Sequence, residues 1–327
     1  MSDAGKVNMK NKTPACSLVI RCYNEEEHIG RLLAGVAKQT VRDVEIILVD
    51  SGSTDATLSI AARYPVRVVS IRPEEFSFGR SLNKGCAGAT GDFIVVASAH
   101  VYPVYNDWLE NLLSPFKKPE VALVYGKQRG DGKAKYAERQ IYRKWYPDVS
   151  IPHQGYPFCN NANAAIRRSL WEKIPYDEEL TGLEDLAWAK RVIEAGWRIV
   201  YSAEAEIIHV HDESYGQIYN RYRREAIAFK HIYPHERFNA WDFVRLLTGN
   251  VFADYFHAWH DGVFPGNLLR IPAFRFMQFW GTYRGFARHG LVTGRLRDRF
   301  YYPKGLKRTD AAVSKNDTER RIDYERH

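Results

Sequence analysis

The feature that most constrains the fold is an alternation of short apolar runs with amphipathic stretches. Residues 17–23 and 44–49 are apolar runs of strand length, and both end in polar residues. One helical face lies between them, formed by Ile29, Leu32, Leu33, Val36 and Ala37. Runs that are apolar on both sides are typical of a parallel sheet covered by helices. The pattern predicts a doubly wound, Rossmann-like, mostly parallel α/β sheet whose ligands bind outside the carboxyl ends of the strands.

The same reasoning assigns the rest of the chain. We expect further strands at 66–71, 93–97, 121–125, 163–166, 199–200 and 206–210. Further helices are predicted at 81–88, 108–116, 184–195 and from residue 215 onward. Asn24 and Glu27 predict a capping box that starts the first helix. Residues 126–158, rich in Lys, Arg, Tyr and Pro, are expected to be irregular and to cover a site.

Composition limits the class of protein. The 327 residues are 45% hydrophobic and 26% charged, which excludes disorder and a polytopic membrane protein. The net charge of +8 predicts an acidic partner: a nucleotide phosphate, an anionic membrane or nucleic acid. None of the four cysteines forms a CxxC pair, which favours the cytoplasm. The predicted divisions are a flexible arm (1–13), a catalytic domain (14–230, halves 14–103 and 104–230), a helical aromatic and basic extension (231–308) and a flexible polar tail (309–327).

Several motifs occur in a specific order: Leu18-Val-Ile-Arg-Cys-Tyr-Asn-Glu-Glu26, Ile46-Ile-Leu-Val-Asp-Ser-Gly-Ser-Thr-Asp55, Gly79 to Gly91, Trp108-Leu-Glu110, Asn160-Asn-Ala-Asn163, Glu184-Asp185 and His209-Val-His211. Together they resemble family 2 glycosyltransferases of the glycosyltransferase-A fold, above all the rhamnosyltransferase-like branch. The resemblance covers about residues 16–230. It implies inverting transfer of a sugar from a UDP-, dTDP- or GDP-sugar to a hydroxyl of a glycan or lipid-linked acceptor, in bacterial surface polysaccharide synthesis.

Asp50 is the central residue of the implied nucleotide site. A carboxylate at a strand end can accept the imide N–H of a pyrimidine, and the resemblance gives Asp50 this role. The alternative is a helix cap, for which Asp55 is better placed. The expected nucleotide-binding residues are Tyr23, Asn24, Glu25, Asp50, Ser53, Arg80, Asn83, Lys84, Ser98 and His100. For those near residue 80, plain helix capping is the alternative.

Glu184 and Asp185 follow a Gly-Leu turn at the start of a predicted helix. The resemblance implies that Asp185 deprotonates the acceptor hydroxyl and that Glu184 orients the base or the acceptor. Ordinary acidic residues in a first helical turn are the alternative. The expected sugar or acceptor contacts are Trp108, Asn161 and Asn163, although such amides are often only structural. A protein that binds nucleotide or glycan without catalysis is the alternative function.

The main departure from the family lies at the end of the fourth strand. Most relatives carry Asp-x-Asp there and hold a divalent cation with it, whereas this chain has Ser98-Ala99-His100. His100 could ligate Mn²⁺, Mg²⁺ or Zn²⁺ with His209 or His211, and imidazole suits Zn²⁺ or Co²⁺ better than Mn²⁺. The alternatives are a metal-free site that uses Arg80, Lys84 or residues 127–144, and a His100 that only packs.

The C-terminal third differs from that of processive relatives. Residues 219–225 lack a Gln-x-x-Arg-Trp motif, so transfer of a single sugar is expected. Arg221 and Arg224 could bind a phosphate, or form a solvated helix face.

A second C-terminal feature is an aromatic stripe formed by Phe276, Phe279, Trp280, Tyr283 and Phe286, in a segment with ten Lys or Arg and one acid. It is typical of an interfacial helix. We therefore expect a protein bound peripherally to the cytoplasmic face of the inner membrane and not to nucleic acid. A core-facing helix or a homodimer contact is the alternative.

Overall fold

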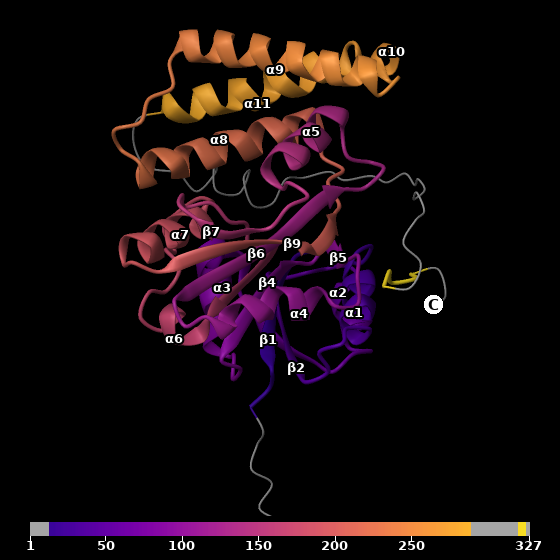
Figure 1. Ribbon diagram of the computed structural model, residues 1–327, viewed down its shortest axis with the longest axis vertical. Coiled ribbons are helices and arrows are strands. Elements are labelled where there is room, and N and C mark those ends of the chain that lie inside the picture. The colour runs from indigo at the N-terminus through magenta and orange to yellow at the C-terminus, as the bar shows by residue number, and fades with distance from the viewer. Residues whose placement is uncertain (1–12, 289–319, 325–327) are drawn as a thin grey trace, which may run out of the picture.

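The strands of the sheet form where the sequence carries its apolar runs. The computed structural model describes residues 13–288 and 320–324. Four strands pair in parallel in the order β3-β2-β1-β4 (Figure 1): β1 (Cys16–Cys22), β2 (Val44–Asp50), β3 (Val66–Ser70) and β4 (Phe93–Ser98). Their carboxyl ends therefore lie along one edge of the sheet, as the doubly wound prediction requires.

The second half of the sheet is mixed. It contains β5 (Val101–Pro103), β6 (Val121–Gly130), β7 (Ile151–Gln154), β8 (Asn163–Arg167) and β9 (Arg198–His209). β8 lies antiparallel between β4 and β6, β9 runs parallel to β6, and β5 and β7 pair antiparallel with β9. The two short strands predicted at 199–200 and 206–210 are parts of the single long strand β9.

Helices cover both faces of the sheet. One face carries α1 (Ile29–Ala37), α2 (Thr57–Ala61) and α4 (Trp108–Leu113), and the other carries α3 (Phe78–Ala87), α6 (Arg168–Trp171) and α7 (Glu184–Glu194). Short 3-10 turns occupy Pro73–Glu75 and Ser114–Lys117. The fully buried Trp108 and Trp188 belong to the cores of the two faces. The predicted α/β fold is thereby confirmed.

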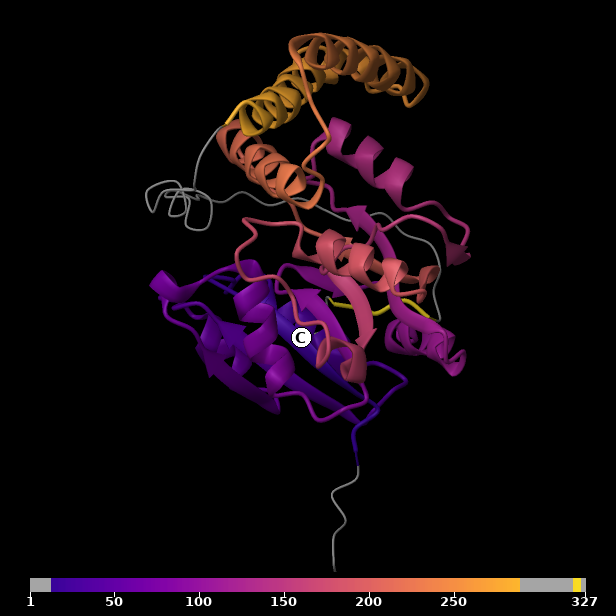
Figure 2. The same ribbon diagram turned by 90° about the vertical axis from the view of Figure 1, so that its left-hand side faces the viewer.

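A helical layer stands at one end of the sheet. It consists of α5 (Tyr136–Trp145), α8 (Tyr215–Ile232), α9 (Ala240–His260), α10 (Phe264–Asn267) and α11 (Arg270–Phe286). α11 packs against α8 on one side and α9 on the other, and α9 is the outermost helix in both views (Figures 1 and 2). Among the described helices, none combines the length and the apolarity that crossing a membrane requires.

The first helix begins later than the predicted capping box. α1 starts at Ile29, and no side chain caps it. Asn24 instead adopts a left-handed conformation with φ of 53°. Its side-chain oxygen accepts a hydrogen bond from Thr54 N–H (2.8 Å) and its own N–H donates to Ser53 Oγ (2.9 Å), so it joins the loops after β1 and β2. Asn24 therefore joins two loops instead of capping α1.

Residues 126–158 are more regular than predicted. They contain the end of β6, the helix α5 and the strand β7. The prediction missed α5 because its buried face includes the charged Glu138, which interrupts the apolar period of the helix.

The aromatic stripe of α11 packs inside the helical layer. Phe243 of α9 lies edge-on to Phe276 and Trp280, with ring centroids about 6 Å away, and Phe286 contacts Phe229 of α8. Only Phe276 keeps two fifths of its surface exposed. This corrects the expectation of an interfacial helix at α11, since its aromatic face has protein partners. The rest of the predicted extension, 289–308, lies outside the described residues.

Part of the predicted polar tail packs on the sheet. Ile322 is buried and its N–H donates to the Val104 carbonyl (3.0 Å), while Arg320 pairs with Asp107 and Tyr324 Oη donates to the Pro103 carbonyl. This corrects the expected flexibility for residues 320–324, because their backbone continues the pairing beside β5. The predicted arm, apart from Thr13, and the rest of the tail lie outside the described residues.

Candidate active site

Asp50 lies at the carboxyl end of β2 and is almost fully buried. Its carboxylate accepts hydrogen bonds from the N–H groups of Gly52 (3.0 Å) and Ser53 (3.2 Å), within a turn that needs the positive φ of Gly52. Asp55, which the sequence offered as the better cap, accepts from Thr57 N–H at the start of α2 (3.0 Å). Asp50 therefore shapes the turn after β2, and Tyr23 lies partly exposed in the adjoining loop.

The predicted phosphate contacts on α3 are engaged elsewhere. Asn83 accepts from Trp171 Nε1 (2.9 Å) and Tyr176 N–H (3.0 Å), and its amide donates to the Tyr176 carbonyl (2.9 Å) and to Glu178 (3.0 Å). Arg80 pairs with the same Glu178 (2.7 Å). These contacts use the hydrogen-bonding capacity of the Asn83 amide, so a ligand role for Asn83 is corrected to a structural one. Lys84 is exposed on the same helix.

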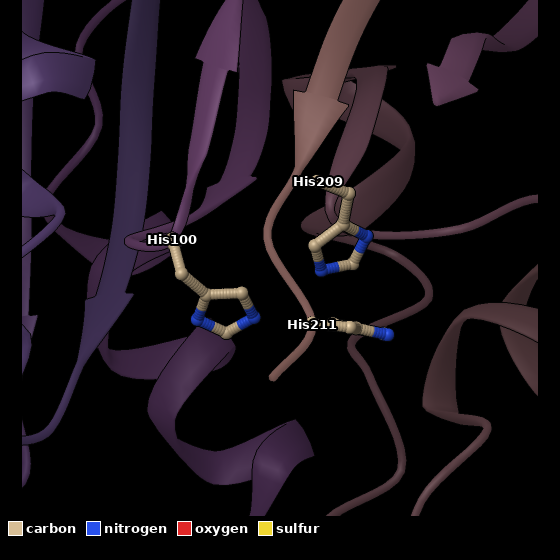
Figure 3. Close-up of side chains that lie close together, drawn as sticks. All are labelled: His100, His209 and His211. Atoms are coloured by element: carbon tan, nitrogen blue, oxygen red, sulfur yellow. The ribbon is translucent and has the colours of Figure 1, made fainter. Parts of the chain in front are cut away.

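Three histidines from distant parts of the chain lie together (Figure 3). β5 pairs with β9 so that Val101 is opposite His209, which brings the preceding His100 beside His209 and His211. The ring centroids of His100 and His209 are 5.1 Å apart and those of His209 and His211 are 4.1 Å apart. One nitrogen from each ring lies within 4.8 Å of the others, a spacing suited to one metal ion.

Each of these rings is oriented by an oxygen acceptor. The Nδ1 atoms lie 2.7 Å from Glu25 Oε1 for His100, 2.8 Å from Gln128 Oε1 for His209 and 2.9 Å from Glu138 Oε1 for His211. Because carboxylate and amide oxygens only accept, Nδ1 carries a proton in each pair, and Nε2 keeps its lone pair where the ring is neutral. Nε2 of His209 is buried and has no hydrogen-bond partner in the described part of the chain. Histidine ligands of metals show this same arrangement.

The pKa values of His209 and His100 shift in opposite directions. Burial, with the neighbouring His211 and His100, lowers the pKa of His209 well below its usual value, which keeps this ring neutral. Burial alone would lower the pKa of His100, but the Glu25 carboxylate outweighs it and the pKa is raised. Ser98, which stands in place of a family aspartate, ends β4 opposite Arg21 of β1. The candidate metal ligands here are therefore the imidazole nitrogens of the three histidines.

Arg221 does not face a phosphate site. Its guanidinium lies 2.6 Å from Glu138 and 2.6 Å from Glu213. Burial would raise the pKa of Glu138, but Arg221 and His211 lower it to about 2. The predicted phosphate contact is thus corrected: Arg221 neutralises two carboxylates and, through Glu138, fixes the ring of His211. No sequence pattern pointed to this network, since Glu138 lies on α5, the helix that was not predicted.

Glu184 and Asp185 begin α7 directly after Leu183, whose φ of 57° turns the chain into the helix. Asp185 is half-buried, and its carboxylate accepts from Asn161 N–H (3.1 Å) and Leu186 N–H (2.8 Å). Burial, followed by the charge of Glu184, raises the pKa of Asp185 to about 7. A carboxylate in this range accepts a proton at neutral pH, as a general base must. Asn161 thereby contacts Asp185 through its N–H, while its buried side chain bonds to Glu184 and Tyr176; its role as a sugar or acceptor contact stays a prediction.

Sequence reasoning missed Arg21, the last but one residue of β1. Its guanidinium lies 3.4 Å from the buried carboxylate of Glu184, and it stacks on Phe78 with 4.8 Å to the ring centroid. Arg224 of α8 stacks on the same ring at 4.6 Å, so Phe78 lies between two arginines. The available signal was a single arginine inside an otherwise apolar strand, next to the strand end. Arg21 offsets the two neighbouring acids and lowers the pKa of Asp185 in part.

Trp108 and Asn163 are structural. Both are completely buried, and Trp108 Nε1 donates to Asn163 Oδ1 (2.8 Å). The Asn163 amide donates to the carbonyls of Lys127 (3.1 Å) and Ala205 (2.8 Å). The prediction that these two residues contact sugar or acceptor is therefore wrong, because no polar atom of either remains for a substrate.

Comparisons with known proteins agree with this geometry. The family model described as "Glycosyl transferase family 2" matches residues 17–174. The chain is 33% identical over 221 residues to the O-antigen chain rhamnosyltransferase WbaN of Salmonella anatum, covering 64% of this chain and 70% of that protein. It is 27% identical over 219 residues to the O-antigen chain rhamnosyltransferase RfbN of Salmonella typhimurium, covering 63% and 69%.

Solved structures share the fold. The mannosyltransferase PcManGT from Pyrobaculum calidifontis, in complex with GDP-Man and Mn²⁺, has a TM-score of 0.56 and 18% identity, covering 90% of this chain and 89% of that one. S. aureus TarS 1-349 in complex with UDP-GlcNAc has a TM-score of 0.51 and 16% identity, covering 82% and 90%. These likenesses show a glycosyltransferase-A fold. With the sequence relatives and the motifs at the strand edge, they show that the chain belongs to glycosyl transferase family 2.

Proposed function

We propose that the protein transfers a single sugar from a nucleotide-activated donor to an acceptor hydroxyl, with inversion, in the synthesis of a bacterial surface polysaccharide or lipid-linked glycan. We propose a hexose or deoxyhexose as the transferred sugar; the names of WbaN and RfbN support a deoxyhexose and a polysaccharide product. The complexes of PcManGT and TarS support a nucleotide sugar as donor. The observation that carries the proposal is Asp185, a carboxylate with a pKa raised to about 7 beside the strand edge.

Asp185 acts as the general base in the proposed reaction. It removes the proton of the acceptor hydroxyl while the hydroxyl oxygen attacks the anomeric carbon, and the nucleoside diphosphate leaves with the electron pair of the broken bond. A single displacement of this kind inverts the anomeric configuration. Asn161 holds the base through its N–H, and Glu184 keeps the pKa of Asp185 raised. The positive charge of Arg21 offsets part of the negative charge of Glu184 and Asp185.

The donor nucleotide lies at the carboxyl ends of β1 and β2 in this proposal. Several hydrogen bonds join the loops that carry Asn24 and Ser53, which gives the base and ribose a fixed surface. Asp50 is the acceptor for a base N–H, and the donor is a UDP-, dTDP- or GDP-sugar. Arg224 stays a proposed contact for the donor phosphates, supported by its position over Phe78 beside Arg21.

The residues fit a divalent metal. Three imidazoles with oriented rings, and a buried Nε2 of His209 that lacks a partner among the described residues, form a nitrogen donor set. His100, His209 and His211 would hold the ion, and Zn²⁺ or Co²⁺ suits them better than Mg²⁺. The bound ion would neutralise charge on the leaving diphosphate. We propose the cytoplasm as the location; the four buried cysteines, none in a disulfide, support it.

The direct test is turnover of a donor panel. UDP-, dTDP- and GDP-sugars are incubated with the full chain, an acceptor glycan and Zn²⁺, Co²⁺, Mn²⁺ or Mg²⁺, and the product is analysed by NMR. We expect one donor to be consumed and the new glycosidic bond to have the inverted configuration. A retained configuration would contradict the mechanism, and nucleotide binding without transfer to any acceptor would favour a binding protein that lacks catalysis.

The pH dependence tests the base separately. Because Asp185 must be ionised to accept a proton, kcat/KM is expected to rise with pH and to level off above a midpoint near the pKa of about 7. Glu184→Gln removes a like charge, so the midpoint should move to lower pH. Initial rates at constant ionic strength and saturating metal measure both profiles. An unchanged or higher midpoint in Glu184→Gln would contradict this assignment of the base.

A further inference from the structure

The outward face of α9 is apolar and exposed. Trp241, Phe252, Phe256 and Trp259 keep 70, 70, 64 and 71% of their surface exposed, and Leu269, just beyond α10, keeps 79%. On a helical wheel the four aromatic residues and Val244 fall within an arc of about 120°. Isolated apolar residues are normal on a protein surface, whereas several large aromatic side chains exposed on one helix face mark an interaction site.

The opposite face of α9 already holds the helix in place. Phe243 packs on the aromatic residues of α11, and Ala258 is fully buried. Asp254 forms a buried ion pair with Arg275 of α11 at 2.7 Å. The outward aromatic residues are therefore not needed to attach α9. In both views α9 lies on the far side of α11 from the sheet, so its outward face points away from the catalytic domain (Figures 1 and 2).

The charge of the helical layer indicates what kind of surface this face binds. The described residues of the helical layer, 136–145, 215–232 and 240–288, contain twelve Lys or Arg and five Asp or Glu, a net charge of +7. Each of the three aspartates among these residues is paired with an arginine: Asp242 with Arg245, Asp254 with Arg275 and Asp261 with Arg143. The helical layer is thus positive, and its natural counterpart is an anionic surface.

We propose that the outward face of α9 docks on an anionic lipid membrane. The helix lies in the plane of the interface and inserts its four outward aromatic rings, with Trp241 and Trp259 about 27 Å apart along the helix. A second copy of the same face would bring like charge against like charge, which opposes an isologous dimer. The proposal goes beyond sugar transfer, and it does not require the assigned base or metal to be correct.

Vesicle co-sedimentation of the full chain, without donor or acceptor, tests the proposal. We expect the protein to pellet with phosphatidylcholine vesicles that contain phosphatidylglycerol, and less with phosphatidylcholine alone or at high salt. Phe252→Ser with Phe256→Ser should weaken partitioning by at least about tenfold. Arg270→Gln with Arg284→Gln should weaken binding to the anionic vesicles only.

Val149→Ser is the matched control, because Val149 is 75% exposed but lies far along the chain from α9. It should bind vesicles as the parent does, and all variants should keep the parent's melting temperature. Light scattering gives the oligomeric state of each variant without lipid. Equal pelleting of the Phe252/Phe256 variant and the parent would overturn the proposal, as would a dimer that these substitutions dissolve and that binds no vesicles.

Discussion

Asp185→Asn is expected to lower kcat by about 10²- to 10⁴-fold while the KM for the donor stays near its parent value. The amide has nearly the shape of the carboxylate and still accepts the Asn161 N–H, but it cannot take the proton of the acceptor hydroxyl. Initial rates of nucleoside diphosphate release, at saturating donor and varied acceptor, measure this effect. A variant with the parent's kcat would exclude Asp185 as the base.

The control for this substitution is Glu194→Gln at the other end of α7, where an exposed carboxylate pairs with Lys190. It should keep full activity. The melting temperature should show whether Asp185→Asn loses activity because the base is missing or because the protein misfolds. The folded-state pKa of Asp185, about 7, lies above the ordinary value of 3.8, so the fold loses stability as the pH rises from 3.8 to about 7, and the full loss remains at higher pH. Asp185→Asn should therefore melt no lower than the parent at pH 8, and a large drop in melting temperature would point to a structural role.

His209→Ala is expected to weaken Co²⁺ or Zn²⁺ binding by more than about 100-fold and to abolish metal-dependent transfer. The ring nitrogen Nε2 of His209 is buried and lacks a hydrogen-bond partner in the described chain, so the substitution removes a proposed metal ligand. The visible absorption of bound Co²⁺ and calorimetric titration measure the loss without any turnover. Gln128→Leu, which removes only the oxygen that orients His209, should weaken binding by about 10- to 100-fold.

His153→Ala provides the matched control, since His153 is exposed and lies outside the three-histidine cluster. It should bind Co²⁺ as the parent does. If His209→Ala kept the parent's affinity, the metal would not be held by this cluster. If the parent kept full activity after treatment with EDTA, the metal-free alternative would be favoured, and the diphosphate charge would be met by arginines such as Arg224.

Local patterns were enough to predict most elements of the sheet. The stripe that begins at Ile29 and the apolar run at 44–49 became α1 and β2, because burial on one or both faces repeats along the sequence. The doubly wound rule then placed Asp50 at the correct edge of the sheet. Where a local rule failed, as at Asn24, a hydrogen bond to another loop replaced the helix cap.

Side-chain roles were harder to predict because they depend on partners distant in sequence. Asn163 was expected to face the substrate, but three acceptors and donors from other elements use its amide. Arg221 was expected to meet phosphate, but Glu138, 83 positions away, pairs with it. Periodicity also cannot reveal which element covers an apolar face, so the α11 stripe was predicted to face lipid whereas α9 carries the exposed aromatic residues.

The packing of residues 320–324 has a consequence for the order of folding. The contacts that join Lys38 to Asp323, Pro103 to Tyr324 and Asp107 to Arg320 span 285, 221 and 213 positions. During synthesis, the backbone groups of residues 104–106 that pair with this segment wait until about 213 further residues have been made. This corner of the domain therefore folds later than the strands that surround it, and until then its backbone groups bond to water.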